Sequence, residues 1–235
     1  WLVRPSTLAG GEASLDTTAV ALQGVYAGDQ ASSGMAGVGD VDGDGIPDIV
    51  VSAHLYDADL PGYGARNGGG IFLVSGADLR ETTSGDALDL EPGLWLYGNA
   101  IADWVGGVVS PAGDVDGDGT ADLLVGATGL DESGDTMAGG LVLLFGGEEL
   151  DPVGVRDVSS QGRGQLMHGP AGEGRSRGQA ATGGDLDGDG LADIAAGAWK
   201  HDSERGAVFI VSGADAADGD ISTIADATLE GADAN

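Results

Sequence analysis

A nine-residue acidic segment occurs three times in this chain and constrains its fold more than any other feature. The copies span residues 40–48, 114–122 and 185–193, and each has the pattern Asp-x-Asp-Gly-Asp-Gly-x-x-Asp. Glycine at the sixth position allows the sharp turn that wraps such a loop around an ion. Carboxylates crowded this closely repel one another unless a cation lies among them, and Ca²⁺ accepts about six to eight oxygen ligands with flexible geometry. The spacing therefore predicts three Ca²⁺ sites.

The predicted ligands are the side chains of positions 1, 3, 5 and 9 and the main-chain carbonyl of position 7 in each segment. Loop by loop, they are Asp40, Asp42, Asp44, Ile46 and Asp48; Asp114, Asp116, Asp118, Thr120 and Asp122; and Asp185, Asp187, Asp189, Leu191 and Asp193. The alternative without a metal is a simple Asp and Gly turn. Three copies with the same carboxylate spacing are hard to obtain from turn chemistry alone.

An EF-hand is the main rival for such a loop, but it needs a Glu at about position 12 and a helix on each side. The residues found at that position are Val51, Val125 and Ala196, whose side chains cannot bind a metal. The segments that follow the loops are short apolar runs rich in β-branched residues and glycine, which are typical of buried strands. We therefore expect each acidic loop to join two strands.

Composition narrows the class of protein further. The chain of 235 residues has no cysteine, so it can form neither a disulfide nor a thiolate metal site. Its 39 Asp and Glu against 9 Lys and Arg give a formal net charge of −30, which three Ca²⁺ would only partly offset. This charge argues against nucleic acid and anionic membranes as partners, because both need basic patches. No membrane-spanning segment is visible, so we expect no membrane insertion.

The acidic loops belong to a longer repeat, because they begin 74 and 71 residues apart. One unit of this length holds about four strands with their connections. The predicted strands are 34–39, 49–53, 70–75 and 94–97; 105–112, 123–127, 140–145 and 164–168; and 178–183, 194–198, 206–212 and 227–230. Consecutive antiparallel strands form a meander, and meanders repeated radially are the blades of a β-propeller. The sequence thus predicts an all-β chain of four-stranded propeller blades.

The chain divides into about three and a half such units. Residues 1–32 are predicted to end a preceding blade, because 1–3 and 19–24 match the third and fourth strands of later units. The blades are predicted at 33–104, 105–176 and 177–235, the last of which includes the start of a further repeat. Propellers have about four to eight blades. We therefore expect an intact ring of about seven blades. The blades that this chain lacks would come from a longer parent chain or from a second copy.

The units resemble FG-GAP repeats, the blades of the integrin alpha-chain propeller. The family pattern is Phe-Gly, a small apolar stretch, Asp-x-Asp-x-Asp-Gly-x-x-Asp, an apolar run and Gly-Ala-Pro. The Phe-Gly position holds Ser33-Gly34, Val105-Gly106 and Arg177-Gly178, and the Gly-Ala-Pro position holds Ser52-Ala53-His54, Gly126-Ala127-Thr128 and Gly197-Ala198-Trp199. The carboxylates are kept, while Phe and Pro are replaced. The resemblance implies a calcium-stabilised, extracellular or cell-surface module for adhesion, protein–protein interaction or surface assembly.

A propeller of this kind has two different rims. The acidic loops lie on one rim, and the opposite rim carries most of the aromatic and His side chains that the sequence places in loops: Tyr26, His54, Tyr56, Tyr63, Trp104, Trp199 and His201. Loops on a rigid scaffold commonly bind ligands, so we expect a protein or glycan ligand there, as the resemblance to integrins also implies. The alternative for Trp104 and Trp199 is packing between blades.

Two other functions remain open on the sequence alone. A carbohydrate-binding propeller is the first, because exposed Trp or Tyr side chains could stack on a sugar ring. A polysaccharide-degrading enzyme is the second, but His54, His168 and His201 fall in non-equivalent positions and no nucleophile–base motif is recognisable. No acid pair stands out from the calcium carboxylates, so we expect no enzymatic activity.

Overall fold

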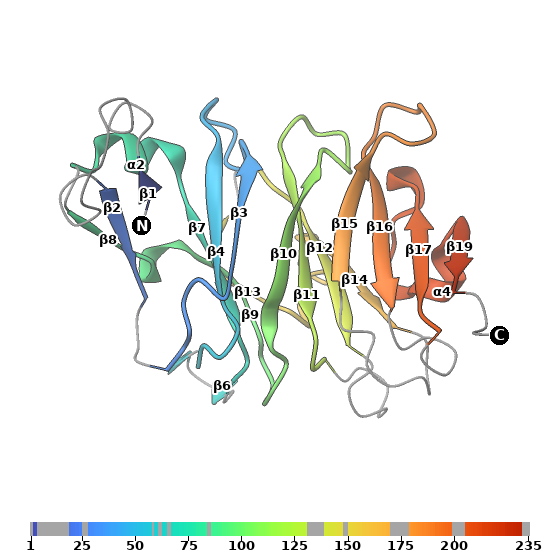
Figure 1. The fold of residues 1–235 in the computed structure, drawn as a ribbon, viewed down its shortest axis with the longest axis horizontal. Coiled ribbons are helices and arrows are strands. Elements are labelled where there is room, and N and C mark those ends of the chain that lie inside the picture. The colour runs from blue at the N-terminus through green and yellow to red at the C-terminus, as the bar shows by residue number, and fades with distance from the viewer. Residues whose placement is uncertain are drawn as a thin grey trace.

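The computed structural model of this chain describes residues 2–3, 19–24, 28–57, 59–60, 63–64, 67–83, 86–130, 139–147, 150–169, 179–198 and 205–231. Most of the regular structure in these segments is β-strand. The predicted all-β architecture is confirmed, and the sheets follow one another in chain order without closing into a ring (Figure 1).

Three antiparallel meanders form the body of the molecule, and we call them the first, second and third blade. They contain β3 (Gly34–Gly39), β4 (Asp48–Ala53), β7 (Gly70–Val74) and β9 (Leu94–Tyr97); β10 (Val105–Gly113), β11 (Asp122–Ala127), β12 (Gly140–Leu144) and β14 (Gly164–His168); and β15 (Gln179–Gly184), β16 (Asp193–Ala198), β17 (Ala207–Val211) and β19 (Ala227–Glu230). These bounds differ from the predicted ones by at most one residue. Before them, β1 (Leu2–Val3) and β2 (Ala19–Gln23) form the expected antiparallel pair.

Apolar side chains at alternate positions of the central strands fill the space between neighbouring blades. On β11, Leu123 and Val125 pack against the first blade, whereas Leu124 packs against the third. This two-residue alternation is the normal side-chain geometry of a strand, so a strand covered on both faces needs apolar residues at successive positions, as Leu123, Leu124 and Val125 provide. All six residues of β11 are buried for this reason.

Neighbouring blades are also joined by short parallel strands that were not predicted from the sequence. The connection between the third and fourth strands of each blade runs back to the preceding sheet and adds a strand to its outer edge. These added strands are β8 (Ala87–Asp89) on β2, β13 (Val153–Gly154) on β9 and β18 (Gly219–Asp220) on β14. A buried apolar residue follows each added strand: Leu90, Val155 and Ile221.

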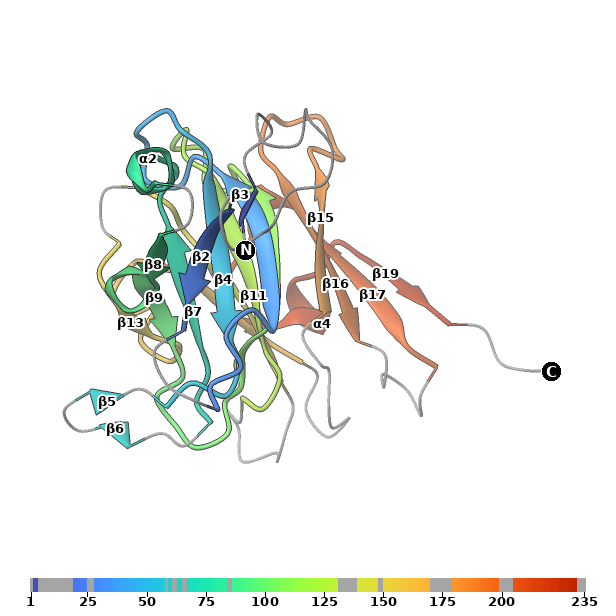
Figure 2. The ribbon, with the colours of Figure 1, turned by 60° about the vertical axis from the view of Figure 1, so that its left-hand side comes forward.

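Short helices and one small hairpin complete the described structure. The helices are α2 (Gly76–Glu81), η2 (Glu91–Gly93), η3 (Gly213–Asp215) and α4 (Ile221–Ile224), all within connections between third and fourth strands. Ser75 begins α2 as its N-cap, with its side chain accepting from the Ala77 N–H. The hairpin of β5 (Asp59–Leu60) and β6 (Tyr63–Gly64) projects from the opposite end of the blade to α2 (Figure 2).

If the residues after the added strands hold the blades together, Leu90→Ala will lower the free energy of unfolding by about 2–5 kcal/mol, because it opens a cavity between sheets. The matched control is Leu229→Ala on β19, where the side chain is 63% exposed instead of 1%. This control should change stability by about 0.5 kcal/mol or less. Chemical denaturation measures both variants, and equal losses would contradict the interpretation.

Candidate metal centres

The three acidic loops lie on the same side of the row of blades. We call this side, formed by residues 40–48, 114–122 and 185–193, the acidic edge. Each loop joins the first and second strands of its blade: β3 to β4, β10 to β11 and β15 to β16 (Figure 1). Strands therefore flank every loop, as predicted, and the EF-hand alternative fails.

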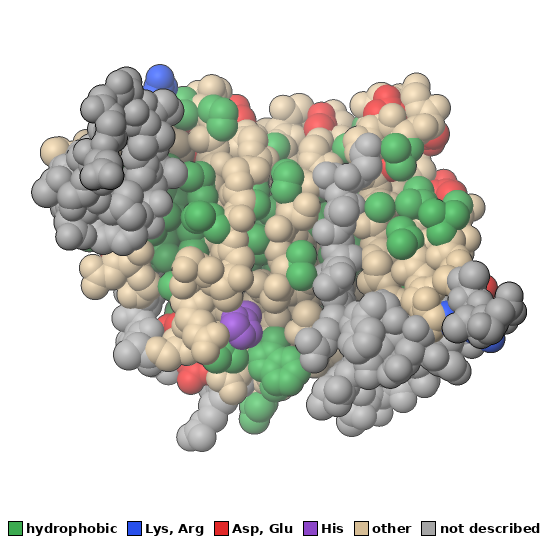
Figure 3. All heavy atoms as spheres, viewed as in Figure 1, with side chains coloured by type: hydrophobic (Ala, Val, Ile, Leu, Met, Phe, Trp, Pro, Cys, Tyr) green, Lys and Arg blue, Asp and Glu red, His purple; other side chains and the backbone are tan. Residues whose placement is uncertain are grey.

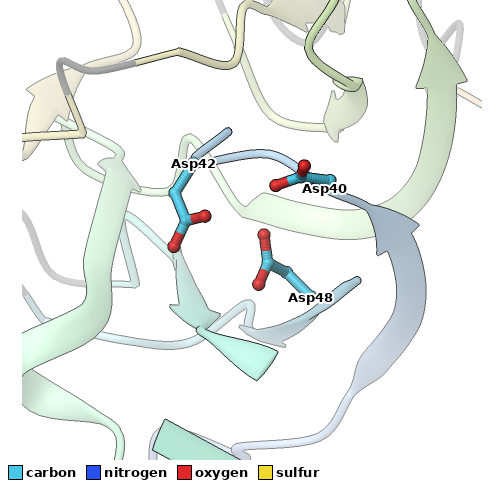
Figure 4. Close-up of side chains that lie close together, drawn as sticks. All are labelled: Asp40, Asp42 and Asp48. Atoms are coloured by element: carbon cyan, nitrogen blue, oxygen red, sulfur yellow. The ribbon is translucent and has the colours of Figure 1, made fainter. Parts of the chain in front are cut away.

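Three carboxylates converge in each loop. Oxygen atoms of positions 1, 3 and 9 all lie within 4.8 Å of one another, and these residues are Asp40, Asp42 and Asp48; Asp114, Asp116 and Asp122; and Asp185, Asp187 and Asp193. Figure 4 shows the first group, in which the three side chains point toward a common space. The fifth-position side chains, Asp44, Asp118 and Asp189, do not belong to these groups.

Hydrogen bonds to the loop's own backbone explain why the loops take this shape. In the first loop, Asp40 Oδ2 accepts from the Gly45 N–H at 2.8 Å, and Asp42 Oδ1 accepts from the Asp44 N–H at 3.1 Å. Asp44 Oδ1 in turn accepts from the Ile46 N–H at 2.7 Å. The same bonds recur in the other two loops. Aspartate favours such local bonds. The fifth-position carboxylate lies outside the converging group but still stabilises the shape of the loop through its bond to the N–H two residues later.

Two glycines make the tight curvature possible. At positions 4 and 6 the backbone angle φ is positive in every loop, with values of 75° and 85° at Gly43 and Gly45 in the first. A side chain at either position would strain this left-handed backbone. The sequence pattern indicated the role of position 6, and the structure adds position 4.

The ninth-position aspartate ties the loop to the rest of its blade. Asp48 is 1% exposed; its Oδ2 accepts from the Val41 N–H and its Oδ1 from the Gly76 N–H, both at 2.8 Å. Asp122 and Asp193 make the equivalent pairs of bonds in the other blades. One buried carboxylate thus joins the acidic loop, the start of the second strand and the segment that follows the third strand.

Burial makes the charge of Asp48 and Asp122 unfavourable while no cation neutralises it. Burial raises the pKa of Asp122 from 3.8 to about 6, and the charge of Asp116 beside it adds to the shift. The pKa values of Asp48 and Asp116 are raised for the same main reason. A divalent cation reverses this preference, because it favours the ionised form.

The side chains present fit a hard divalent cation. Each centre offers carboxylate oxygens without any His or Cys, which is the donor set of Ca²⁺ or Mg²⁺. Asp40 Oδ1 is buried and has no hydrogen-bond partner among the residues that the structure describes, although buried oxygen atoms are normally paired. That unpaired oxygen is accounted for if it binds an ion. The carbonyls of Ile46, Thr120 and Leu191 remain predicted ligands.

The described aromatic and His residues assigned to the opposite rim lie in its connections, but several are buried or half-buried there. Tyr56 is buried, with its ring edge-on to Phe72 at a centroid distance of 5.2 Å, so its predicted exposure is wrong. Trp104 is half-buried against the backbone at Gly129, where a Cβ would lie 2.8 Å from Trp104 Cε3. His54 is also half-buried, and Tyr63 lies in β6. Tyr26, Trp199 and His201 lie outside the described residues.

An ion pair that the sequence did not indicate joins the first and second blades. Asp103 is 1% exposed and binds the Arg156 guanidinium through both oxygens, at 2.5 and 2.8 Å. Arg156 also donates to Asn99 Oδ1 at 3.3 Å. Asn99 and Asp103 belong to the connection after β9. Arg156 follows β13, the short strand of the second blade that pairs with β9. A bidentate pair of this kind fixes the position of the connection between blades.

Comparison with protein families agrees with this geometry. A family model of the FG-GAP repeat matches residues 36–74, 105–144 and 177–211, which in each blade run from the first strand through the acidic loop to the third strand. The chain carries three FG-GAP repeats. Comparison with curated proteins gives no match. Among the residues that the structure describes, no helix is long and apolar enough to cross a membrane.

The raised pKa values of Asp48, Asp116 and Asp122 predict different pH responses with and without a bound cation. Without calcium, Asp122 keeps a proton in the folded chain between about pH 4 and 6 that the unfolded chain has released, so stability falls as pH rises through this window. With calcium this loss should disappear, because the ionised form is the one that binds. Melting temperatures of metal-stripped and calcium-loaded protein from pH 4 to 8 test this, and parallel profiles would contradict it.

Proposed function

We propose that this chain is a Ca²⁺-stabilised, extracellular β-propeller module that serves adhesion, protein–protein interaction or surface assembly. The observation that carries the proposal is the threefold repetition of a partly buried carboxylate group inside FG-GAP repeats. In each centre, the carboxylates of positions 1, 3, 5 and 9 and the carbonyl of position 7 would hold the ion. The ion would neutralise the buried aspartates and fix the hairpin between the first two strands.

The role assigned to calcium is structural rather than catalytic. Both oxygens of Asp48 and of its counterparts accept backbone N–H bonds, so these residues serve to hold three segments of a blade together. An ion that binds only the folded chain raises the free energy of unfolding by RT ln(1 + [L]/Kd), about 1.4 kcal/mol for a site whose Kd lies tenfold below free calcium.

Removal of calcium should therefore lower the melting temperature by on the order of 10 °C, if three such sites contribute. Calorimetric titration of metal-stripped protein should give three Ca²⁺ per chain. The matched control is Mg²⁺ at the same concentration, which should restore less of the stability, because Mg²⁺ demands strict octahedral geometry and sheds water reluctantly. A melting temperature that does not change in excess chelator would reject the calcium role.

The edge opposite the acidic loops is the proposed site for a partner. Its connections carry exposed apolar groups: Ile101 is 73% exposed beside the half-buried Trp104, and hydrophobic atoms reach the surface on this edge in Figure 3. Exposed apolar side chains next to an aromatic residue are common in protein interfaces. We therefore favour a protein partner. Binding of the chain to sugars on a glycan array would instead support a carbohydrate ligand.

The outer face of the third blade is proposed to be covered by a further blade. Leu141, Leu143 and Met167 of the second blade are buried by the third, whereas their counterparts on the third blade are partly or largely exposed. Those counterparts include Val208 at 37% and Leu229 at 63% exposure, and Leu186 is 56% exposed where Val41 and Val115 are buried. Hydrophobic side chains gather over β17 and β19 in Figure 3. This face therefore has the same apolar character as the interfaces inside the molecule.

The 235-residue chain by itself should then self-associate as its concentration rises, because the exposed face can bury itself against another copy. Leu229→Asp should shift the species toward the monomer, since a charge cannot be buried there. The matched control is Ile101→Asp, which changes a similarly exposed residue on the edge opposite the acidic loops. This control should leave the mass of the associated species unchanged. Sedimentation equilibrium measures both variants. A wild-type chain that stays monomeric at all concentrations would refute the proposed docking face.

A further inference from the structure

Adjacent acidic loops are hydrogen-bonded to one another along the acidic edge. The Ala121 N–H, at position 8 of the second loop, donates to the carbonyl of Asp40, position 1 of the first loop, at 2.9 Å. The Ala192 N–H of the third loop donates in the same way to the carbonyl of Asp114 at 3.0 Å. In both cases the acceptor is a first-position aspartate and the donor directly precedes a ninth-position aspartate. A single backbone hydrogen bond thus joins residues that belong to neighbouring metal centres.

Close packing reinforces this contact. A Cβ on Gly39, directly before the first loop, would lie 3.0 Å from the Ala121 Cβ, and one on Gly113 would lie 2.9 Å from the Ala192 Cβ. The Val41 carbonyl also accepts from the Gly147 N–H of the next blade at 2.8 Å. A loop that loses its folded shape must therefore disturb the loop beside it.

Building on the proposed calcium binding, we propose that the three centres act as a linear cooperative chain. Filling one loop raises the Ca²⁺ affinity of its neighbour, whereas the first and third loops are not coupled directly. An empty loop is strained by its crowded carboxylates, and the hydrogen bond from the next loop forms only when both loops are ordered. An ion that orders one loop therefore lowers the cost of ordering the other, and this effect is reciprocal. The sheets would then stiffen over a narrow range of calcium concentration.

Charge acts in the opposite direction. Each bound ion reduces the negative potential that attracts the next one, and salt screens this effect, because exposed charges more than about 8–10 Å apart interact weakly at physiological ionic strength. The hydrogen-bond coupling does not depend on salt in this way. The proposal therefore predicts that the apparent Hill coefficient for calcium rises when KCl is added, rather than falls.

The test compares three variants that each keep two centres. Asp42→Ala, Asp116→Ala and Asp187→Ala each remove a third-position carboxylate that is half-buried or exposed. Asp116→Ala leaves the first and third centres, which are not neighbours, and should bind two ions independently. Asp42→Ala and Asp187→Ala each leave a neighbouring pair, which should bind with a Hill coefficient above one. Pairwise double variants give the affinity of each centre alone, and the neighbouring pairs should exceed the product of these affinities by about fivefold or more.

A second set of variants cuts the link without removing a carboxylate. Proline stands at position 8 of the first loop as Pro47, so the loop backbone accepts proline there. Ala121→Pro removes the N–H that donates to Asp40, and in the Asp187→Ala background it should bring the Hill coefficient to one. Ala121→Ser keeps the N–H, so in the same background it should leave the Hill coefficient above one.

A Hill coefficient that stays above one in Ala121→Pro, or independent binding in both neighbouring pairs, overturns the coupling. Wild-type protein that binds no calcium would instead refute the proposed function on which it rests.

Discussion

The buried aspartate at the ninth position of each acidic loop is the interaction on which the blades depend. Asp48, Asp122 and Asp193 each accept two backbone N–H bonds, one from the loop and one from the segment that follows the third strand. Burying a charged carboxylate is unfavourable unless a proton or a cation compensates it. The residue that organises the blade is therefore also part of the candidate metal centre, so the fold and the proposed ion binding depend on the same carboxylate.

The strands and the acidic loops could be predicted from the sequence because both are local patterns. Apolar runs of alternating or continuous character set the strands, and the spacing of carboxylates and glycines set the loops. The added strands β8, β13 and β18 could not be predicted, because they are only two or three residues long and their stability comes from the edge they join. Tyr56 looked like a loop residue, but its turn brings the ring onto Phe72.

Equivalent residues differ in burial according to whether another blade stands beside them. Val41 and Val115 occupy position 2 of their loops and are 0% and 1% exposed, whereas Leu186 at the same position is 56% exposed. Nothing in the loop motif distinguishes them, since all three are apolar. Only the arrangement of the sheets shows that the first two lie between blades. The motif therefore encodes the interface as well as the candidate metal centre, and the third loop keeps an apolar residue at a face that the described chain leaves open.

The two edges of the molecule differ in how freely their sequences can vary. On the acidic edge, every loop has nine residues, two glycines with positive φ and hydrogen bonds to the loop beside it, so an insertion would separate the blades. On the opposite edge, the connections 54–69, 128–139 and 199–206 differ in length and sequence. Loops that vary in length and sequence on a rigid scaffold are where binding surfaces usually arise. This contrast supports our proposal that a partner binds at the edge opposite the acidic loops.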